Sequence, residues 1–118
     1  MKIIEHTFLV ETRVEFNRDE LDRMFEASEN HYDVKCRMAS KPGGFLWGML
    51  TVMQRAEDDG LATAEYTLSS DRLDTLCKIL ESPLAPMDLQ NRVQEILRSN
   101  IAEGKRVNQI AKDEQYNL

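Results

Sequence analysis

The chain has 118 residues, of which 42% are apolar and 31% are charged, and its formal net charge is −6 at pH 7. This length suits one domain, which we expect over residues 1–112, followed by a frayed tail over residues 113–118. No block is basic enough for a nucleic-acid footprint, which needs clustered Lys and Arg. No apolar run approaches the roughly 20 residues that span a bilayer. We therefore expect neither nucleic acid nor a membrane as a partner.

The cysteines and the N-terminal residues indicate a compartment. Cys36 and Cys77 both fall on the apolar side of a predicted helix, where a reduced thiol behaves as a small buried hydrophobic group. Glu5 and His6 interrupt the first apolar residues, so the hydrophobic region of a secretory leader is not formed. We expect a cytoplasmic protein.

Residues 4–16 alternate between apolar and polar side chains, as a half-buried strand does. A helix is predicted next, over residues 18–39, because Asn17 is a good N-cap and Glu20 completes a capping box. The inner face of the strand is expected to carry Phe8, Val10, Thr12, Val14 and Phe16. The inward stripe of the helix is expected to be Leu21, Met24, Phe25, Ser28, Tyr32, Cys36 and Ala39.

Residues 40–50 hold three of the five glycines and the only tryptophan. Pro42 lacks an N–H, so the preceding helix should stop just before it, and Gly43 and Gly44 allow the chain to reverse. Residues 45–53 are apolar throughout, and periodicity alone does not separate a buried strand from a buried helix there. We expect a strand, because the run is short and the acidic turn after it is typical of a hairpin connection.

A second strand is predicted over residues 61–68, followed by a helix over residues 70–81 with Ser69 as its N-cap. The last helix should begin near Pro86 or Met87, and Gly104 either ends it or is carried inside it. The resulting order, β-α-β-β-α-α, predicts a small α+β domain with an antiparallel sheet and helices packed on one face.

No arrangement of residues predicts catalysis or a metal site. His6, His31 and the two cysteines lack the spacings that aim two ligands at one ion, and no nucleophile elbow, Walker loop or dinucleotide fingerprint occurs. Cys36 has basic neighbours, but His31 lies off its helical face, so a core thiol is the favoured interpretation. We expect no cofactor and no enzymatic activity.

The leading hypothesis is a non-enzymatic module that binds another protein through the acidic side of the helix over residues 18–39. Its expected binding residues are Asp19, Asp22, Glu26, Glu29 and Asp33. They would meet a basic surface, where charge complementarity sets the association rate. Small inhibitors and regulators of macromolecular complexes carried by phages and other mobile elements often share this profile, which is an analogy of composition only.

Two alternatives stay open. The first is a site for an anionic metabolite or nucleotide, or an interface patch, at the turn that carries Arg37, Lys41, Gly43, Gly44, Phe45 and Trp47. For Trp47 and Phe45 we expect core packing ahead of an exposed patch. The second is a homodimer formed by the last helix, whose apolar stripe is wide enough to serve the core and a second copy. That stripe is Leu89, Val93, Ile96, Leu97 and Ile101.

Overall fold

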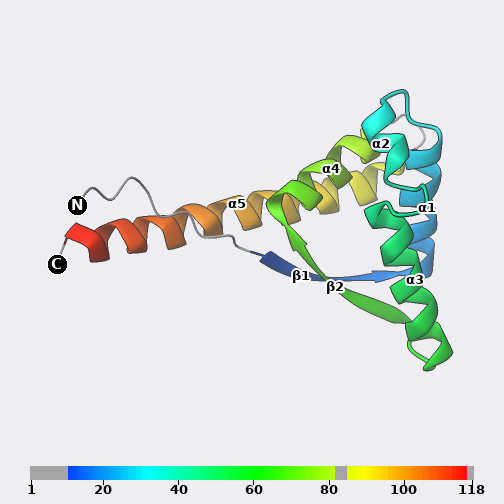
Figure 1. Cartoon of the computed structure of the whole chain (residues 1–118), viewed down its shortest axis with the longest axis horizontal. Coiled ribbons are helices and arrows are strands. Elements are labelled where there is room, and N and C mark those ends of the chain that lie inside the picture. The colour runs from blue at the N-terminus through cyan, green and yellow to red at the C-terminus, as the bar shows by residue number, and fades with distance from the viewer. Residues whose placement is uncertain (1–10, 82–84, 117–118) are drawn as a thin grey trace.

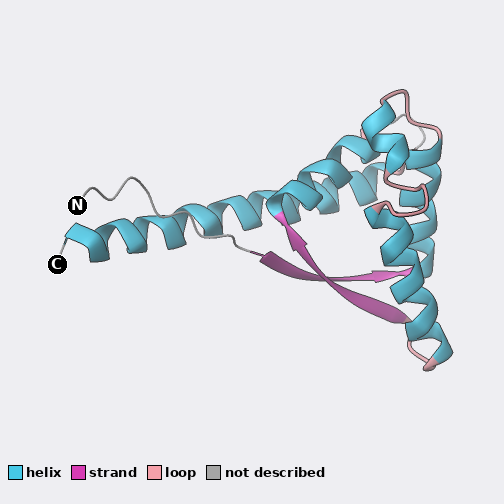
Figure 2. Ribbon diagram, viewed as in Figure 1, coloured by secondary structure: helices cyan, strands magenta, loops and turns pink. Residues whose placement is uncertain are grey.

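The structure is a computed structural model that describes residues 11–81 and 85–116. Its elements in chain order are β1 (Glu11–Asn17), α1 (Arg18–Glu29), α2 (Val34–Met38), α3 (Phe45–Asp58), β2 (Thr63–Ser69), α4 (Ser70–Leu80) and α5 (Met87–Tyr116). Figures 1 and 2 show an open triangle in which the β1–β2 ribbon is one side, α1 with α3 is the second, and α4 with the first half of α5 is the third. The α+β class expected from the sequence is confirmed.

The two strands pair antiparallel, with Glu11 opposite Ser69 and Asn17 opposite Thr63. One face of the ribbon is buried and the other is exposed, as alternation along a strand requires. The buried side chains are Val14, Phe16, Ala64, Tyr66 and Leu68. The strands predicted over residues 4–16 and 61–68 and the packing of helices on one face are thus confirmed for the described part. Residues 4–10, with Phe8 and Val10, lie outside the described residues.

The strand predicted over residues 45–53 is wrong, because this segment is the first part of helix α3. Its buried residues recur at helical spacing and are Leu46, Met49, Met53 and Ala56. Trp47 and Val52 on the other faces are also apolar but exposed, so the sequence reads as a continuous apolar run. The helical period is present, and the apolar residues on the exposed side hide it.

The single helix predicted over residues 18–39 is broken between α1 and α2. The Asn30 backbone N–H and its side-chain amide both donate to the Glu26 carbonyl, at 3.2 and 2.9 Å, and end α1. Asp33 then caps α2, since short polar side chains compete for backbone groups at helix ends. The break turns Tyr32 outward to 87% exposure, against its predicted inward place. The rest of the predicted stripe is buried or half-buried: Leu21, Met24, Phe25, Ser28, Cys36 and Ala39.

Helix α5 carries Gly104 inside it and extends away from the triangle (Figure 1). It runs to Tyr116, into the segment over residues 113–118 that was expected to fray, and the end of the domain stays a prediction. Leu89 and Val93 are buried in the protein's own core. Ile96 and Leu97 are partly buried against that core and Ile101 is 42% exposed, and a homodimer through this stripe stays a prediction.

Gly44, at the junction of α2 with α3, and Gly48, inside α3, differ in the space around them. A Cβ on Gly44 would lie 2.3 Å from the Ala39 carbonyl oxygen, whereas a Cβ on Gly48 would meet nothing within 4 Å. We expect Gly44→Ala to lower the free energy of unfolding by roughly 2–3 kcal/mol. We expect Gly48→Ala, its matched control, to raise it by about 0.5–1 kcal/mol through helix propensity. Urea unfolding measures both, and equal effects would contradict the close junction.

Candidate functional site

The outward side of α1 carries four of the five predicted partner-binding acids, which we call the α1 acidic face: Asp19, Asp22, Glu26 and Glu29. On the opposite side of the helix Leu21, Met24 and Ala27 are buried. The fifth acid, Asp33, lies beyond the helix break, where its carboxylate accepts the Lys35 N–H at 2.9 Å as the cap of α2. The structure therefore groups four of the five acids and assigns the fifth a structural bond.

Ion pairs compensate the N-terminal half of this face. Asp19 lies 3.0 Å from Arg23, and Asp22 lies 3.5 Å from Arg18. Arg18 also lies 3.3 Å from Glu57 of α3, so the cation is shared between two acids. All of these groups are substantially exposed, and exposed pairs of this kind contribute little to stability.

The C-terminal half of the face is uncompensated. Glu26 and Glu29 are exposed and have no ion-pair partner among the described residues. The C-terminus of a helix carries its own partial negative charge. The uncompensated carboxylates of α1 therefore lie toward the loop that leads to α2.

A buried histidine joins that loop to α4. His31 is 5% exposed; its Nδ1 accepts the Asp33 N–H at 3.0 Å, and its Nε2 lies 3.0 Å from the Lys78 carbonyl oxygen. A carbonyl only accepts and Nδ1 is already accepting, so the ring carries its proton on Nε2 and donates to Lys78. The neutral ring thereby fixes the loop against the last turn of α4.

Two further side chains hold the same loop. Arg37 Nη1 donates to the His31 and Tyr32 carbonyls at 2.8 and 2.9 Å, and the Ser28 hydroxyl donates to the Cys36 carbonyl. The loop's polar backbone groups are thus bonded inside the protein rather than left to solvent. Arg37, predicted as an anion ligand, is directed at the protein's own backbone.

The backbone N–H groups at the turn between α2 and α3 are also bonded within the protein. Gly43 has a φ of +88° and reverses the chain, and Gly44 is the N-cap of α3. The second and third N–H groups of that helix, those of Leu46 and Trp47, both donate to the Ala39 carbonyl, at 3.0 and 3.3 Å. An anion at this turn would compete with those bonds, so the ligand site predicted there stays a prediction without geometric support. Lys41 is exposed beside it.

The two aromatic residues of the turn have different surroundings. Phe45 is half-buried against the core, with the Arg72 guanidinium 4.9 Å above its ring. Trp47 is 44% exposed and its ring lies 6.4 Å from that of Phe25 on α1. Trp47 is thus at the boundary of α3 and α1, contrary to its expected place in the core.

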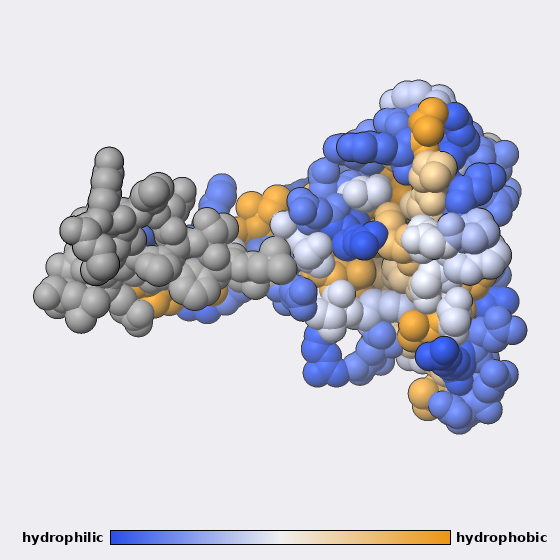
Figure 3. All heavy atoms as spheres, in the orientation of Figure 1, coloured by the Kyte–Doolittle hydropathy of each residue, from blue (hydrophilic) through white to orange (hydrophobic). Residues whose placement is uncertain are grey.

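Sequence reasoning missed three exposed apolar residues in the loop before α2 and on α2 itself. Tyr32, Val34 and Met38 are 87%, 61% and 57% exposed. We call these three residues, together with Trp47, the apical surface. Figure 3 shows apolar atoms open to solvent at the α2 end, among hydrophilic neighbours. Asn30 and Asp33 are the residues in the sequence that indicate the break between α1 and α2, because Asn and Asp often end or begin helices.

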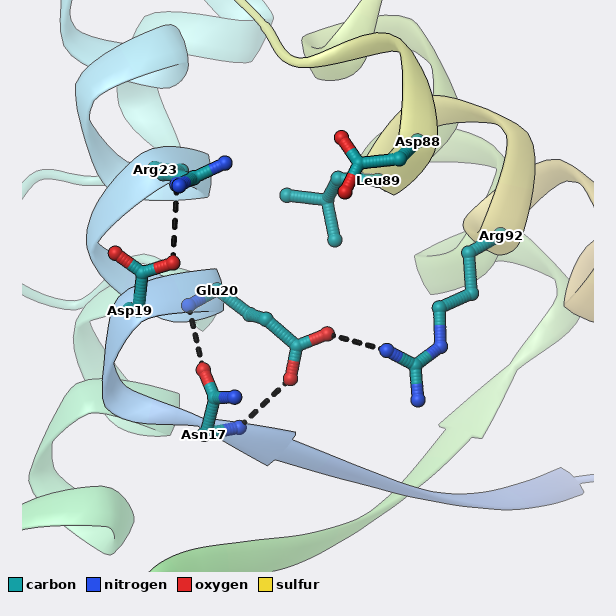
Figure 4. A pocket seen from close by; sticks show the side chains of 7 residues that line it. All are labelled: Asn17, Asp19, Glu20, Arg23, Asp88, Leu89 and Arg92. Atoms are coloured by element: carbon teal, nitrogen blue, oxygen red, sulfur yellow. Dashed lines mark hydrogen bonds and ion pairs between the residues drawn. The ribbon is translucent and has the colours of Figure 1, made fainter.

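A hollow of about 530 Å³ lies between the first turns of α1 and α5 (Figure 4). Arg92 donates to one Glu20 oxygen at 2.8 Å, and the other oxygen accepts the Asn17 N–H at 3.0 Å. Arg23 is paired with Asp19 at the rim. Because the carboxylates of the hollow compensate both arginines, the hollow offers an anion no uncompensated cation. The bond between Arg92 and Glu20 joins α5 to the capping box of α1.

Neither thiol has the environment of a nucleophile. Cys36 and Cys77 are free and buried; burial raises the pKa of Cys77 to about 11 and shifts the pKa of Cys36 upward. A protonated, buried thiol is unreactive. Across residues 11–81 and 85–116, no three potential metal ligands are grouped together. No helix in these ranges has both the length and the apolarity of a bilayer span.

Comparison with models of protein families, with curated proteins and with solved structures gives no significant match to this chain. Function is therefore inferred from the chemistry of its surfaces.

His31→Ala removes the ring that bonds the loop to α4. We expect the free energy of unfolding to fall by roughly 2–4 kcal/mol, because a buried cavity forms and two backbone groups lose their partner. Amide exchange over residues 30–36 should accelerate. Val34→Ala, at an exposed position of the same segment, is the matched control and should change stability by less than about 0.5 kcal/mol. A similar loss in both variants would contradict the role of the His31 ring.

Alkaline pH should destabilise the fold in two steps. The pKa of Cys77 rises from 9.0 to about 11, and burial raises the pKa of Tyr66, whose hydroxyl donates to the Met49 carbonyl at 2.7 Å, from 10.0 to about 12. Each group contributes stability that is complete below its unfolded pKa and is lost as pH rises through its folded pKa. We expect urea midpoints to fall above pH 9 and faster above pH 10. Tyr66→Phe should flatten the second step, and an unchanged slope in that variant would contradict this assignment.

Proposed function

We propose that this chain is a non-enzymatic protein-binding module, an inhibitor or regulator of a macromolecular complex, whose α1 acidic face meets a basic surface of another protein. The observation that carries the proposal is the display of four acids along one exposed side of a helix whose opposite side is buried. A helix anchored in this way presents its charges in a fixed register, so little ordering is needed on binding.

Contacts at both ends of α1 support this rigidity. At the start, Asn17 and Glu20 form a reciprocal capping box, and Arg92 of α5 bonds to Glu20. Beyond the end, His31 fixes the following loop to α4. These bonds hold the helix in place at both ends. The carboxylates of the α1 acidic face take no part in them.

Charge favours a basic partner. The chain carries a net charge of −6, and Glu26 and Glu29 are uncompensated on the surface. A potential of this sign steers a basic partner into encounter and speeds association. A surface that grips nucleic acid has the complementary charge. Binding to such a surface would block it, which is the inhibitory role that we propose.

The two free thiols favour a reducing compartment, and we propose that the module acts in the cytoplasm. We propose no direct contact with nucleic acid or a membrane, since the acidic face would repel both phosphates and anionic lipid headgroups.

Reversal of charge at Asp22→Lys and Glu26→Lys tests the proposal. In affinity capture from the native lysate, we expect the unmodified protein to retain one stoichiometric basic protein, and the double variant to lose it. With that protein purified, the variant should associate at least about tenfold more slowly at low salt and show a flatter salt dependence.

The matched control is Glu95→Lys with Asp113→Lys on α5, which changes the net charge by the same amount away from α1. It should retain the partner. Equal loss in both double variants would show a general charge effect, and equal retention in both would exclude the α1 acidic face. A lysate that yields no stoichiometric partner would contradict the proposed function itself.

A further inference from the structure

The apical surface gathers large apolar side chains on a segment that is held by hydrogen bonds to α4 and within the loop. Val34 and Met38 are one turn apart on the outward side of α2, while Cys36 and Ala39 on its inward side are buried. The Tyr32 ring stacks on the His31 ring at 4.7 Å. Single exposed apolar residues are ordinary, but aromatic and Met side chains grouped on neighbouring elements are typical of an interface.

Opposite charges flank this surface on different sides. Arg37 is directed to the loop, as its bonds to the loop carbonyls show. Lys35 leaves α2 about 160° from Arg37 around the helix, because successive residues are about 100° apart, so it lies on the side away from the loop. Exposed Lys41 follows α2 in the turn, and exposed Glu29 ends α1 on the loop side. Exposed Glu29 thus lies toward α1 and Lys35 lies on the far side of α2, while Asp33 caps α2 and the Arg37 guanidinium is bonded to the loop carbonyls.

We infer that the apical surface binds the apical surface of a second copy of this chain about a twofold axis. A twofold interface uses one patch twice, so it must be complementary to itself. An apolar centre with an acidic and a basic flank meets this condition, because the rotation carries Glu29 of one copy toward Lys35 of the other. Trp47 and Met38 then lie in the region from which water is excluded.

Other occupants fit this surface less well. A basic partner would approach Lys35 and Lys41, and an acidic partner would approach Glu29, so each would meet repulsion on one flank. The four apolar side chains are also few beside the roughly 20–30 residues that each partner contributes to a standard interface. A weak dimer with a micromolar dissociation constant is therefore expected rather than an obligate one.

Sedimentation velocity over a concentration series of the full chain, together with the emission of its single tryptophan, measures this association. We expect a reversible monomer–dimer equilibrium in which Trp47 emission shifts to the blue as the dimer forms. Met38→Ser should weaken the dimer at least about tenfold, with the fold unaffected because the side chain is mostly exposed. Ile110→Ser, at a 45% exposed position on α5, is the matched control and should leave the equilibrium unchanged.

A charge exchange tests the orientation of the two copies. Glu29→Lys and Lys35→Glu should each weaken the dimer, since each places like charges opposite one another, and the two together should restore it. Both single changes agree with the helix dipoles, because Glu29 ends α1 and Lys35 begins α2, so loss of folding does not explain a loss of association.

Three results would overturn the inference. They are a monomer at every concentration, a dimer that Ile110→Ser weakens and Met38→Ser does not, or a charge exchange in which the double variant stays as weak as the single ones. The proposed function is tested separately, because Asp22→Lys with Glu26→Lys should remove the basic partner and leave the dimer unchanged.

Discussion

The hydrogen bond from the His31 ring to the Lys78 carbonyl closes the triangle on which the surface geometry depends. The β1–β2 ribbon separates the start of α1 from the start of α4, because antiparallel strands deliver their following helices to opposite ends. The two sides converge again where the loop after α1 reaches the last turn of α4, and Arg92 of α5 adds a second bond between them at Glu20. Asp33, Arg37 and Ser28 complete the bonding of that loop. A change at this corner is therefore transmitted to α1 and α2 together.

Much of the architecture could be predicted from local chemistry. The N-caps of α1 and α4 form without long-range contacts. Asn17 forms a capping box with Glu20, and Ser69 accepts the Arg72 N–H, so both helices start where the sequence predicts. Alternation identifies the strands because one face of the ribbon is buried. The α1 acidic face follows in the same way, since residues three and four apart share a side of any helix.

The remaining errors arise where tertiary contacts decide between local alternatives. Residues 45–58 form a helix because the Ala39 carbonyl accepts the second and third N–H groups of the segment and Gly44 fits against it, neither of which is visible in an apolar run. The break after Glu29 depends on His31, whose partner in α4 lies 47 residues away. A helix without this break puts Tyr32 on the inner side, so the sequence pattern alone does not indicate the apical surface.

Both proposed interactions use surfaces whose shape is set by buried bonds rather than by a partner. The α1 acidic face is uncompensated toward its C-terminal end, and the apical surface begins just beyond that end, so the His31 loop borders both. Under the two proposals, one corner presents charge to a basic protein and apolar side chains to a second copy. Glu29 belongs to both surfaces, so Asp22 with Glu26 on one side and Lys35 on the other are the charges that distinguish the two interactions.

Backbone ¹⁵N relaxation of the free protein tests most directly whether this corner is rigid before any partner arrives. A preformed surface predicts order parameters of about 0.85 over residues 30–47, equal to those of α1. Values below about 0.6 over residues 30–38 would show that the loop and α2 are mobile on this timescale. That result would contradict the account, because binding would then have to order the surface.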